Sequence, residues 1–485
     1  MIRNLKNDKS IFLISLALSF VYILPFIINN NYVVDDWLRT DTGVTAWEGN
    51  GRPLSSVIMA AISMFGGGLN FFGDGVLYDI FPLTIILCAF VMIFCGYLIS
   101  AELSLKSPIA KAACMLLPLT STLFIGNIYF RFDSLIMSLS CLGAILQARM
   151  SAERSIVCWI SSVVIGFISI SIYQASIPFV LSYLALMCFM RCCNENKNDV
   201  INLILKVFSS LFFSFLLYKL MMLVFFDGDS YTSGYTDTHS ELIPLSVDGL
   251  KIFVNNFSLF INMLYKVTAF APSIILLTLI IVMLVISSIK RNKITAFSVL
   301  AFVAIIVLGF APYLVLKSPI VEPRVMIAAG LSFCALLKGV EMMSKLGALS
   351  KSLIVVIIAF NFSQAYGVSN AFKIYQRIDR VVAQNIAYNL IEYGYKTGDK
   401  IVISGFPSYP DSVKRIYDAI PVSQYLVGSA FANYRFKYSL MKQYGISSPI
   451  PKDERFKGDG EIIKNNSLIK LIKYEDGYRI YINRM

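Results

Sequence analysis

The sequence predicts a polytopic α-helical membrane protein with a small α/β domain at its C-terminal end. Hydrophobic residues make up 57% of the 485 residues and charged residues only 15%, whereas soluble globular proteins carry about 25% charged residues. The mean hydropathy is +0.69. Apolar segments that are long enough, or nearly so, to cross the roughly 30 Å hydrocarbon core of a bilayer recur over most of the chain.

The first apolar run, 11–28, follows a basic N-terminus that contains Arg3, Lys6 and Lys9. Signal peptides share this arrangement, but no small-residue cleavage site follows the run, so we expect a retained transmembrane helix. Ten further apolar segments bring the prediction to about eleven transmembrane helices. The predicted spans are 11–28, 78–100, 110–126, 134–148, 156–173, 175–191, 203–226, 268–289, 295–316, 325–343 and 352–369.

Charge in the loops predicts the orientation of these spans. Short loops rich in Lys and Arg stay in the cytoplasm, and every alternate loop of the prediction is short and basic. The basic loop residues are Lys106, Lys111, Arg149, Arg154, Arg191, Lys197, Lys290, Arg291, Lys293, Lys345 and Lys351. The pattern predicts a cytoplasmic N-terminus and a C-terminus outside. It also explains the net charge of +12, so we expect no nucleic-acid partner.

Residues 370–485 form a more polar tail, which predicts a separate domain after the membrane domain 1–369. "DKIVISG" has the pattern of a strand and "DSVKRIYDAI" that of a short helix. The segment "SLIKLIKYEDGYRIYIN" alternates around Asp476-Gly477, which is typical of a β-hairpin. We therefore expect a C-terminal α/β domain on the outer side of the membrane.

The first outer loop, 29–77, is far longer than a turn requires and contains an acidic pair. The stretch "NNNYVVDDWLRT" places Asp35, Asp36 and Trp37 a few residues after the first span, and Arg52 follows in "WEGNGRP". Charged groups next to hydrocarbon are costly and tend to mark function. We therefore take Asp35 and Asp36 as candidate catalytic residues.

Two very short outer loops bring further charges to the same depth. They contain Arg131 and Asp133 in "YFRFDS", and Lys317, Glu322 and Arg324 in "KSPIVEPR". Carboxylates and guanidinium groups at the outer leaflet suit group transfer from a lipid-linked phosphate. Arginine binds the phosphate, fixed cations stabilise the departing phosphate, and a carboxylate takes the acceptor's proton.

Three segments of the chain resemble a known family. "VVDDWLRTDTGVTAWEGNGRPLSSVIM", "YFRFDSLIMSLS" and "EPRVMIAAG" are similar to the O-antigen glucosyltransferases of the Gtr serotype-conversion family, within the GT-C architecture of membrane glycosyltransferases. The resemblance covers most of the membrane part, and it implies a GT-C-like fold.

The resemblance also implies an activity and its partners. Such enzymes take glucose from undecaprenyl phosphate glucose and transfer it, with inversion, to a sugar of a lipid-linked O-antigen repeat, the lipopolysaccharide precursor. The reaction takes place on the periplasmic face of the bacterial inner membrane. Family partners are a synthase of the lipid-linked glucose and a flippase.

Site residues follow from the resemblance in the same way. Asp35 or Asp36 is the base, and the choice between them stays open. Arg52, Arg131 and Arg324 are phosphate or sugar ligands, and Asp133 orients Arg131 or binds a sugar hydroxyl. Further substrate-binding candidates are Trp37, Lys317 and Glu322.

Each candidate also has a plainer interpretation. The acidic pair could be a solvated loop or a helix cap, Arg131 and Asp133 could form a local salt bridge, and Lys317 could pair with Glu322. With nine cysteines inside or in spans and one histidine, we expect no disulfide, no cysteine or zinc metal site and no cofactor. A carboxylate-bound Mg²⁺ or Ca²⁺ at the acidic pair stays open.

Two rival functions remain at this point. An O-antigen polymerase or ligase also uses lipid-linked sugars, but such enzymes place critical residues in large late loops. A lipid-linked sugar flippase or transporter predicts mid-span charges and inverted repeats, and the sequence shows few of the former and no sign of the latter.

Overall fold

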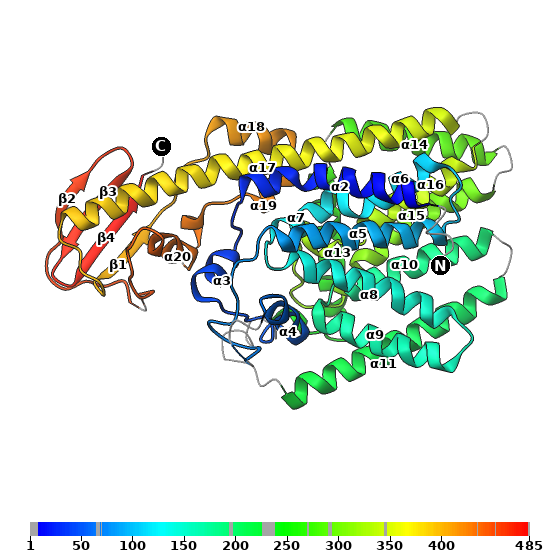
Figure 1. Ribbon diagram of the computed structural model, residues 1–485, viewed down its shortest axis with the longest axis horizontal. Helices are drawn as coiled ribbons and strands as arrows, with labels where there is room; N and C mark the ends of the chain where they lie inside the picture. The colour runs from blue at the N-terminus through cyan, green and yellow to red at the C-terminus, as the bar shows by residue number, and fades with distance from the viewer. Residues whose placement is uncertain are drawn as a thin grey trace.

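The computed structural model describes residues 8–64, 68, 70–193, 197–225, 238–268, 271–289, 293–343, 347–433, 435–451 and 453–483. Figure 1 shows a helical bundle at one end of an elongated molecule and a small sheet at the other. The long helix α17 (Gly347–Glu392) connects the two, and α3 (Asp36–Thr42) and α4 (Pro53–Ile62) lie between them. Of the basic loop residues, Arg3, Lys6, Lys290, Arg291 and Lys345 lie outside the described residues.

Helices account for nearly all of the bundle. Its other helices are α2 (Lys9–Asn29), α5 (Leu83–Glu102), α6 (Pro108–Thr120), α7 (Ile125–Tyr129), α8 (Ser134–Ala152), α9 (Ile156–Ile172), α10 (Ser176–Cys193), α11 (Lys197–Phe225), α13 (Val247–Thr268), α14 (Ala271–Ile289), α15 (Lys293–Leu314) and α16 (Ala329–Glu341), with short 3₁₀ turns η1 (Thr122–Phe124) and η2 (Pro323–Val325). Within the described residues, eight helices are long and apolar enough to cross a membrane. The membrane character expected from composition is therefore confirmed.

All eleven predicted spans are helical, but two of them fall short of a full span. Helix α9 has 17 residues and α16 has only 13. The count of eleven therefore stays a prediction. Small residues allow close packing in the bundle: a Cβ at Gly96 of α5 would lie 2.5 Å from the Met115 backbone of α6, so this glycine lets the two helices touch.

Helix α13 was not predicted. Its sequence contains Lys251, Asn256 and Lys266, which lower its hydropathy below that of a span. Asn256 is buried and donates hydrogen bonds to the carbonyls of Leu314 and Leu316, just after α15. The helix thus contacts the bundle along one stripe of residues, and an analysis that looks for continuously apolar segments misses it.

Helix α17 contains the last predicted span and continues past the predicted domain boundary into the tail. Its 46 residues give a length of about 69 Å, more than twice the thickness of the hydrocarbon core. No proline interrupts it, so the apolar period continues through the predicted domain boundary at 369/370 without a break. The tail is therefore carried on a continuous helix rather than on a linker.

The basic loops gather at the end of the bundle that is remote from the sheet. Lys111 pairs with Asp8 at 2.7 Å, next to the start of α2. Glu341 at the end of α16 accepts hydrogen bonds from the backbone N–H groups of Lys106 and Ser107, both at 2.7 Å. The N-terminus is marked at this same end (Figure 1), as the alternation of loop charge leads one to expect.

The C-terminal domain contains a four-stranded sheet in the order β1-β4-β3-β2. Its remaining elements are β1 (Lys400–Ser404), α18 (Asp411–Ala419), α19 (Ser423–Leu426), η3 (Ala430–Ala432), α20 (Phe436–Lys442), β2 (Glu461–Asn465), β3 (Ile469–Tyr474) and β4 (Gly477–Ile482). Strand β1 is parallel to β4, and the other neighbours are antiparallel. The predicted strand, short helix and hairpin at Asp476-Gly477 are all confirmed.

Candidate active site

The outer loops that carry the predicted site residues meet at the end of the bundle that faces the C-terminal domain (Figure 1). Helix α3 begins at Asp36, and Gly43 caps its C-terminal end. The Gly43 N–H bonds to the Arg39 carbonyl at 2.8 Å, and the φ angle of Gly43 is +68°. A Cβ at Gly43 would lie 2.7 Å from the Leu77 carbonyl oxygen. The long first loop is therefore folded back tightly onto its own end.

Asp133 links the first loop to the start of α8. Its Oδ2 accepts a 2.8 Å hydrogen bond from Arg39 Nη1. Its Oδ1 accepts one at 2.8 Å from Trp47 Nε1 and a longer one at 3.4 Å from Arg52 Nη1. Asp133, Arg39 and Trp47 are all buried. A buried carboxylate requires charged or polar partners, and the first loop supplies all three partners of Asp133.

Arg131 is held from several sides, and its partner is Asp79 rather than Asp133. Its Nη1 forms an ion pair with Asp79 Oδ2, just before α5. Its Nη2 donates to Asn30 Oδ1 and to the Asn31 carbonyl, the latter at 3.2 Å. The interpretation that Asp133 orients Arg131 is therefore wrong, because the guanidinium points toward the end of α2 and the Asp79 carboxylate.

Two aromatic rings enclose the same guanidinium. Arg131 Cζ lies 3.9 Å from the centroid of Tyr32 and 4.5 Å from that of Phe81, distances at which a cation is attracted to a ring face. The Arg131 side chain is 1% exposed. It can set the electrostatic potential of the site, but its partners leave little room for direct contact with a phosphate.

The two adjacent aspartates have different environments. The Asp36 residue is completely buried, and its Oδ2 accepts hydrogen bonds from the backbone N–H groups of Val33 at 3.0 Å and Arg131 at 3.3 Å. Its Oδ1 is buried without a partner. The Asp35 side chain is 50% exposed and lies 3.9 Å from Arg39 Nη1. Of the pair, only Asp35 offers its carboxylate to an approaching molecule.

Burial raises the pKa of Asp36 from its ordinary value of 3.8 to about 7. The nearby Arg131 charge lowers the pKa, and the Asp133 charge raises it, but loss of hydration is the largest effect. The carboxyl group therefore titrates near neutral pH. Groups with pKa values displaced in this way cluster at functional sites.

Arg52 and Arg324 approach the site from two loops far apart in the sequence. The side chains are 20% and 26% exposed, respectively. Arg52 lies over the ring of Tyr173 at 5.3 Å, and the Tyr173 hydroxyl is within electrostatic range of Arg52, Asp133, Arg324 and Glu322. Arg52 and Arg324, from two separate loops, therefore both lie near Tyr173.

The predicted Lys317–Glu322 pair is wrong. Lys317 binds Glu241 at 2.9 Å, and Arg324 binds Glu322 at 2.6 Å. A backbone bridge between Leu242 and Leu316 places Glu241 directly beside Lys317, and no sequence pattern predicts this bridge. Lys317 and Glu241 are about half exposed.

Trp37 does not line the site. It is 3% exposed and belongs to the hydrophobic core of the C-terminal domain. This burial gives no support to its assignment as a substrate-binding residue, and the two neighbours differ because successive side chains of a helix point in different directions. Asp36 faces the bundle and Trp37 faces the tail. The C-terminal domain contacts α3 through this side chain.

Sequence reasoning missed four members of the site. Arg39 and Trp47 stand in the first loop, but their importance depends on the distant Asp133. Tyr32 depends on Arg131 in the same way. Asp79 carried a weak signal, since it is an acidic residue immediately before a span, in "YDIFP".

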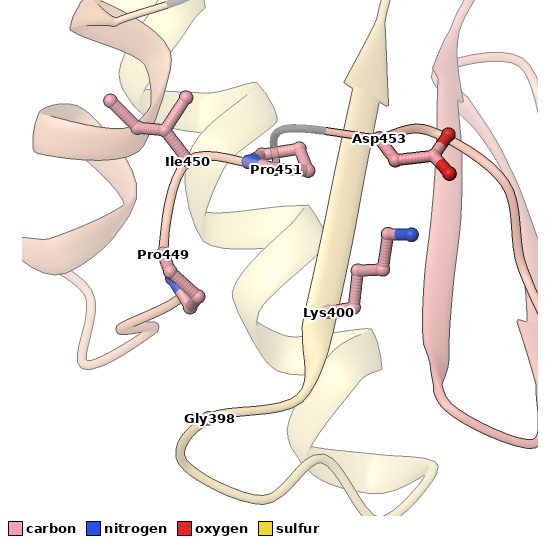
Figure 2. Close-up of a pocket in the computed structure, with 6 residues that line it drawn as sticks. All are labelled: Gly398, Lys400, Pro449, Ile450, Pro451 and Asp453. Atoms are coloured by element: carbon pink, nitrogen blue, oxygen red, sulfur yellow. The ribbon is translucent and has the colours of Figure 1, made fainter.

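Two cavities lie away from the charged cluster. Figure 2 shows one of about 370 Å³ in the C-terminal domain, where Lys400 and Asp453 face each other beside Pro449, Ile450 and Pro451. The other, of about 330 Å³, is lined by Asp8, Tyr97 and Lys111 at the basic end of the bundle. Neither cavity includes a predicted site residue.

Comparison with known proteins identifies the family. A family model described as "Glucosyl transferase GtrII" matches residues 24–336, which include the first loop and the Arg131, Asp133 and Arg324 segments. A protein of Salmonella phage P22, described as an uncharacterized 55.3 kDa protein in the gtrB 5' region, is 26% identical over 263 residues. That match covers 53% of this chain and 50% of the phage protein. The chain belongs to the GtrII glucosyl transferase family.

Proposed function

We propose that this protein transfers glucose from undecaprenyl phosphate glucose to a sugar of a lipid-linked O-antigen repeat, as a step of serotype conversion. The reaction would take place on the periplasmic face of the bacterial inner membrane. One observation supports the proposal above all: the family match includes a charged cluster in which Asp133 accepts hydrogen bonds from Arg39, Trp47 and Arg52 of the long first loop.

Arg52 and Arg324 are the proposed ligands of the donor phosphate. Both are partly exposed, and both flank Tyr173. Each guanidinium group can bind two phosphate oxygens at once. It also stabilises the negative charge that grows on the departing phosphate. Arg131 is enclosed, so we assign it an electrostatic role only.

Asp35 is the proposed base. Its half-exposed carboxylate takes the proton from the acceptor hydroxyl as the oxygen of that hydroxyl bonds to C1 of glucose. The bond between C1 and the phosphate oxygen breaks at the same time, and undecaprenyl phosphate leaves with the bonding electron pair. A single displacement at C1 inverts a β-linked donor to an α-linked product.

Mass spectrometry of surface polysaccharide tests the proposal. Cells that express the protein with a synthase and a flippase for the lipid-linked glucose gain one hexose per repeat. Cells with Asp35→Asn do not, whereas Asp74→Asn, a change at an exposed acid of the same loop, leaves the gain intact. A change in chain length alone would favour a polymerase, and an unchanged polysaccharide would overturn the proposal.

A further inference from the structure

The hydrophobic core of the C-terminal domain contains a side chain from the first loop. Trp37 is 3% exposed and shares this core with Ile386 of α17, Phe431 of η3 and Leu440 of α20. The other buried members of the core, among the described residues, all lie between residues 382 and 482. The domain is therefore completed by a residue that follows directly after Asp36.

A chain of ring contacts leads from this core to the charged cluster. The rings of Trp37 and Tyr32 lie 4.8 Å apart at an interplanar angle of 30°. The Tyr32 ring also contacts the Arg131 guanidinium, which lies 3.9 Å from the ring centroid. Arg131 in turn donates its backbone N–H to Asp36. Three contacts thus connect Trp37 in the domain core to the buried aspartate, through Tyr32 and Arg131.

Polar contacts fix the same segment to the domain at two more points. Gln376 of α17 binds both the N–H and the carbonyl of Tyr32 through its side-chain amide. Lys442 at the end of α20 pairs with Asp41 of α3 at 2.7 Å. Since α17 also runs into the membrane bundle, the domain cannot move freely with respect to the cluster.

We infer that the C-terminal domain helps to position the transfer site and that Trp37 and Tyr32 are positioning residues. They hold Arg131 and the Asp35–Asp36 segment in place. This inference rests on the proposed function for its catalytic consequence. The contact itself is independent of the sugar that is transferred.

Kinetics of the purified full-length protein test the inference. Trp37→Ala lets α3 shift, and a displacement of about 1 Å lowers kcat by roughly 100-fold. KM for the lipid-linked donor stays within a few-fold, because Arg52 and Arg324 lie outside the contact. Trp37→Phe keeps an aromatic ring and restores most of kcat. If kcat per folded Trp37→Ala molecule equals the wild-type value, the inference is wrong.

Hydrogen exchange separates this inference from the proposed function. Trp37→Ala raises amide exchange in residues 30–42 and 129–134, whereas the matched control Leu471→Ala, a cavity on β3 in the same core, raises it in the sheet but not in 129–134. The inference fails if Trp37→Ala leaves exchange in 129–134 unchanged. If Trp37→Ala exchanges faster in 129–134 but the wild-type chain transfers no glucose, only the proposed function is overturned. If the Trp37→Ala variant does not accumulate, the same exchange measurement is made on Trp37→Leu.

Discussion

Asp35 and Asp36 are neighbours in the chain, yet the side chain of Asp35 is 50% exposed and Asp36 is completely buried. The start of α3 produces this difference, because successive side chains of a helix point in different directions. Asp36 turns toward the backbone of Arg131, and Asp35 turns toward solvent. The two carboxylates therefore differ in their access to solvent, and the predictions below separate their proposed roles.

The stability of the protein should fall as pH rises from about 4 to about 7. In this window the folded protein keeps a proton on Asp36, whose pKa is raised from 3.8 to about 7, and the unfolded chain does not. The effect over the whole window is about 4 kcal/mol. Asp36→Asn removes it, so the thermal midpoint of this variant should vary less between pH 5 and pH 8 than the wild-type midpoint. Parallel pH curves would contradict the assignment.

Asp133→Ala should destabilise the protein strongly. The change leaves Arg39 buried without its 2.8 Å partner, and breaking a buried ion pair costs about 3–5 kcal/mol. Glu241→Ala breaks the half-exposed pair with Lys317 and serves as the control, at a cost of about 1 kcal/mol or less. Thermal unfolding in detergent measures both. Equal shifts for the two variants would refute the central role of Asp133.

Asp79→Asn should lower the turnover number by about 10-fold without preventing folding. The amide keeps the shape of the side chain but removes the charge that holds Arg131, and a small displacement of a catalytic group has this size of effect. Sugar transfer by the purified variant is the measurement. Asp74→Asn should match the wild type. An Asp79→Asn enzyme with wild-type turnover would show that the ion pair is dispensable.

Arg52→Gln and Arg324→Gln should each raise KM for the lipid-linked donor by about 10-fold to 100-fold. A hydrogen bond to a charged group is worth about 1.5–3 kcal/mol. Because the two side chains are partly exposed, the thermal midpoint should change little. Lys251→Gln, an exposed cation on α13, provides the comparison. Unchanged donor KM in both arginine variants would remove them from the phosphate site.

Much of the fold could be predicted from the sequence because the membrane restricts it. The length of the apolar segments and the alternating loop charge were sufficient to predict the spans, and each predicted span is helical in the structure. Helix α13 escaped, since its buried Asn256 binds the distant carbonyls of Leu314 and Leu316. The continuity of α17 also escaped, because the change of composition near residue 370 suggests a boundary where the backbone has none.

The site could be predicted only in outline. Charge at the membrane surface singled out Asp35, Asp36, Arg131 and Asp133, and the structure brings them together. The pairing within the cluster could not be predicted, because Asp79 and Arg131 are 52 residues apart in the chain. The place of Trp37 could not be predicted either, since apart from Tyr32 its core neighbours lie in the tail. Contacts between distant segments depend on tertiary packing, which a single sequence does not display.

The most direct test of the account is the single-turnover rate of glucose transfer by purified Asp35→Asn and Asp36→Asn, measured beside donor binding. The account predicts that Asp35→Asn binds donor normally but transfers about 100-fold to 10,000-fold more slowly. Asp36→Asn, whose side chain lies out of reach of an acceptor, should transfer at about a tenth of the wild-type rate or faster. Wild-type transfer by Asp35→Asn, with an inactive Asp36→Asn, would contradict the account.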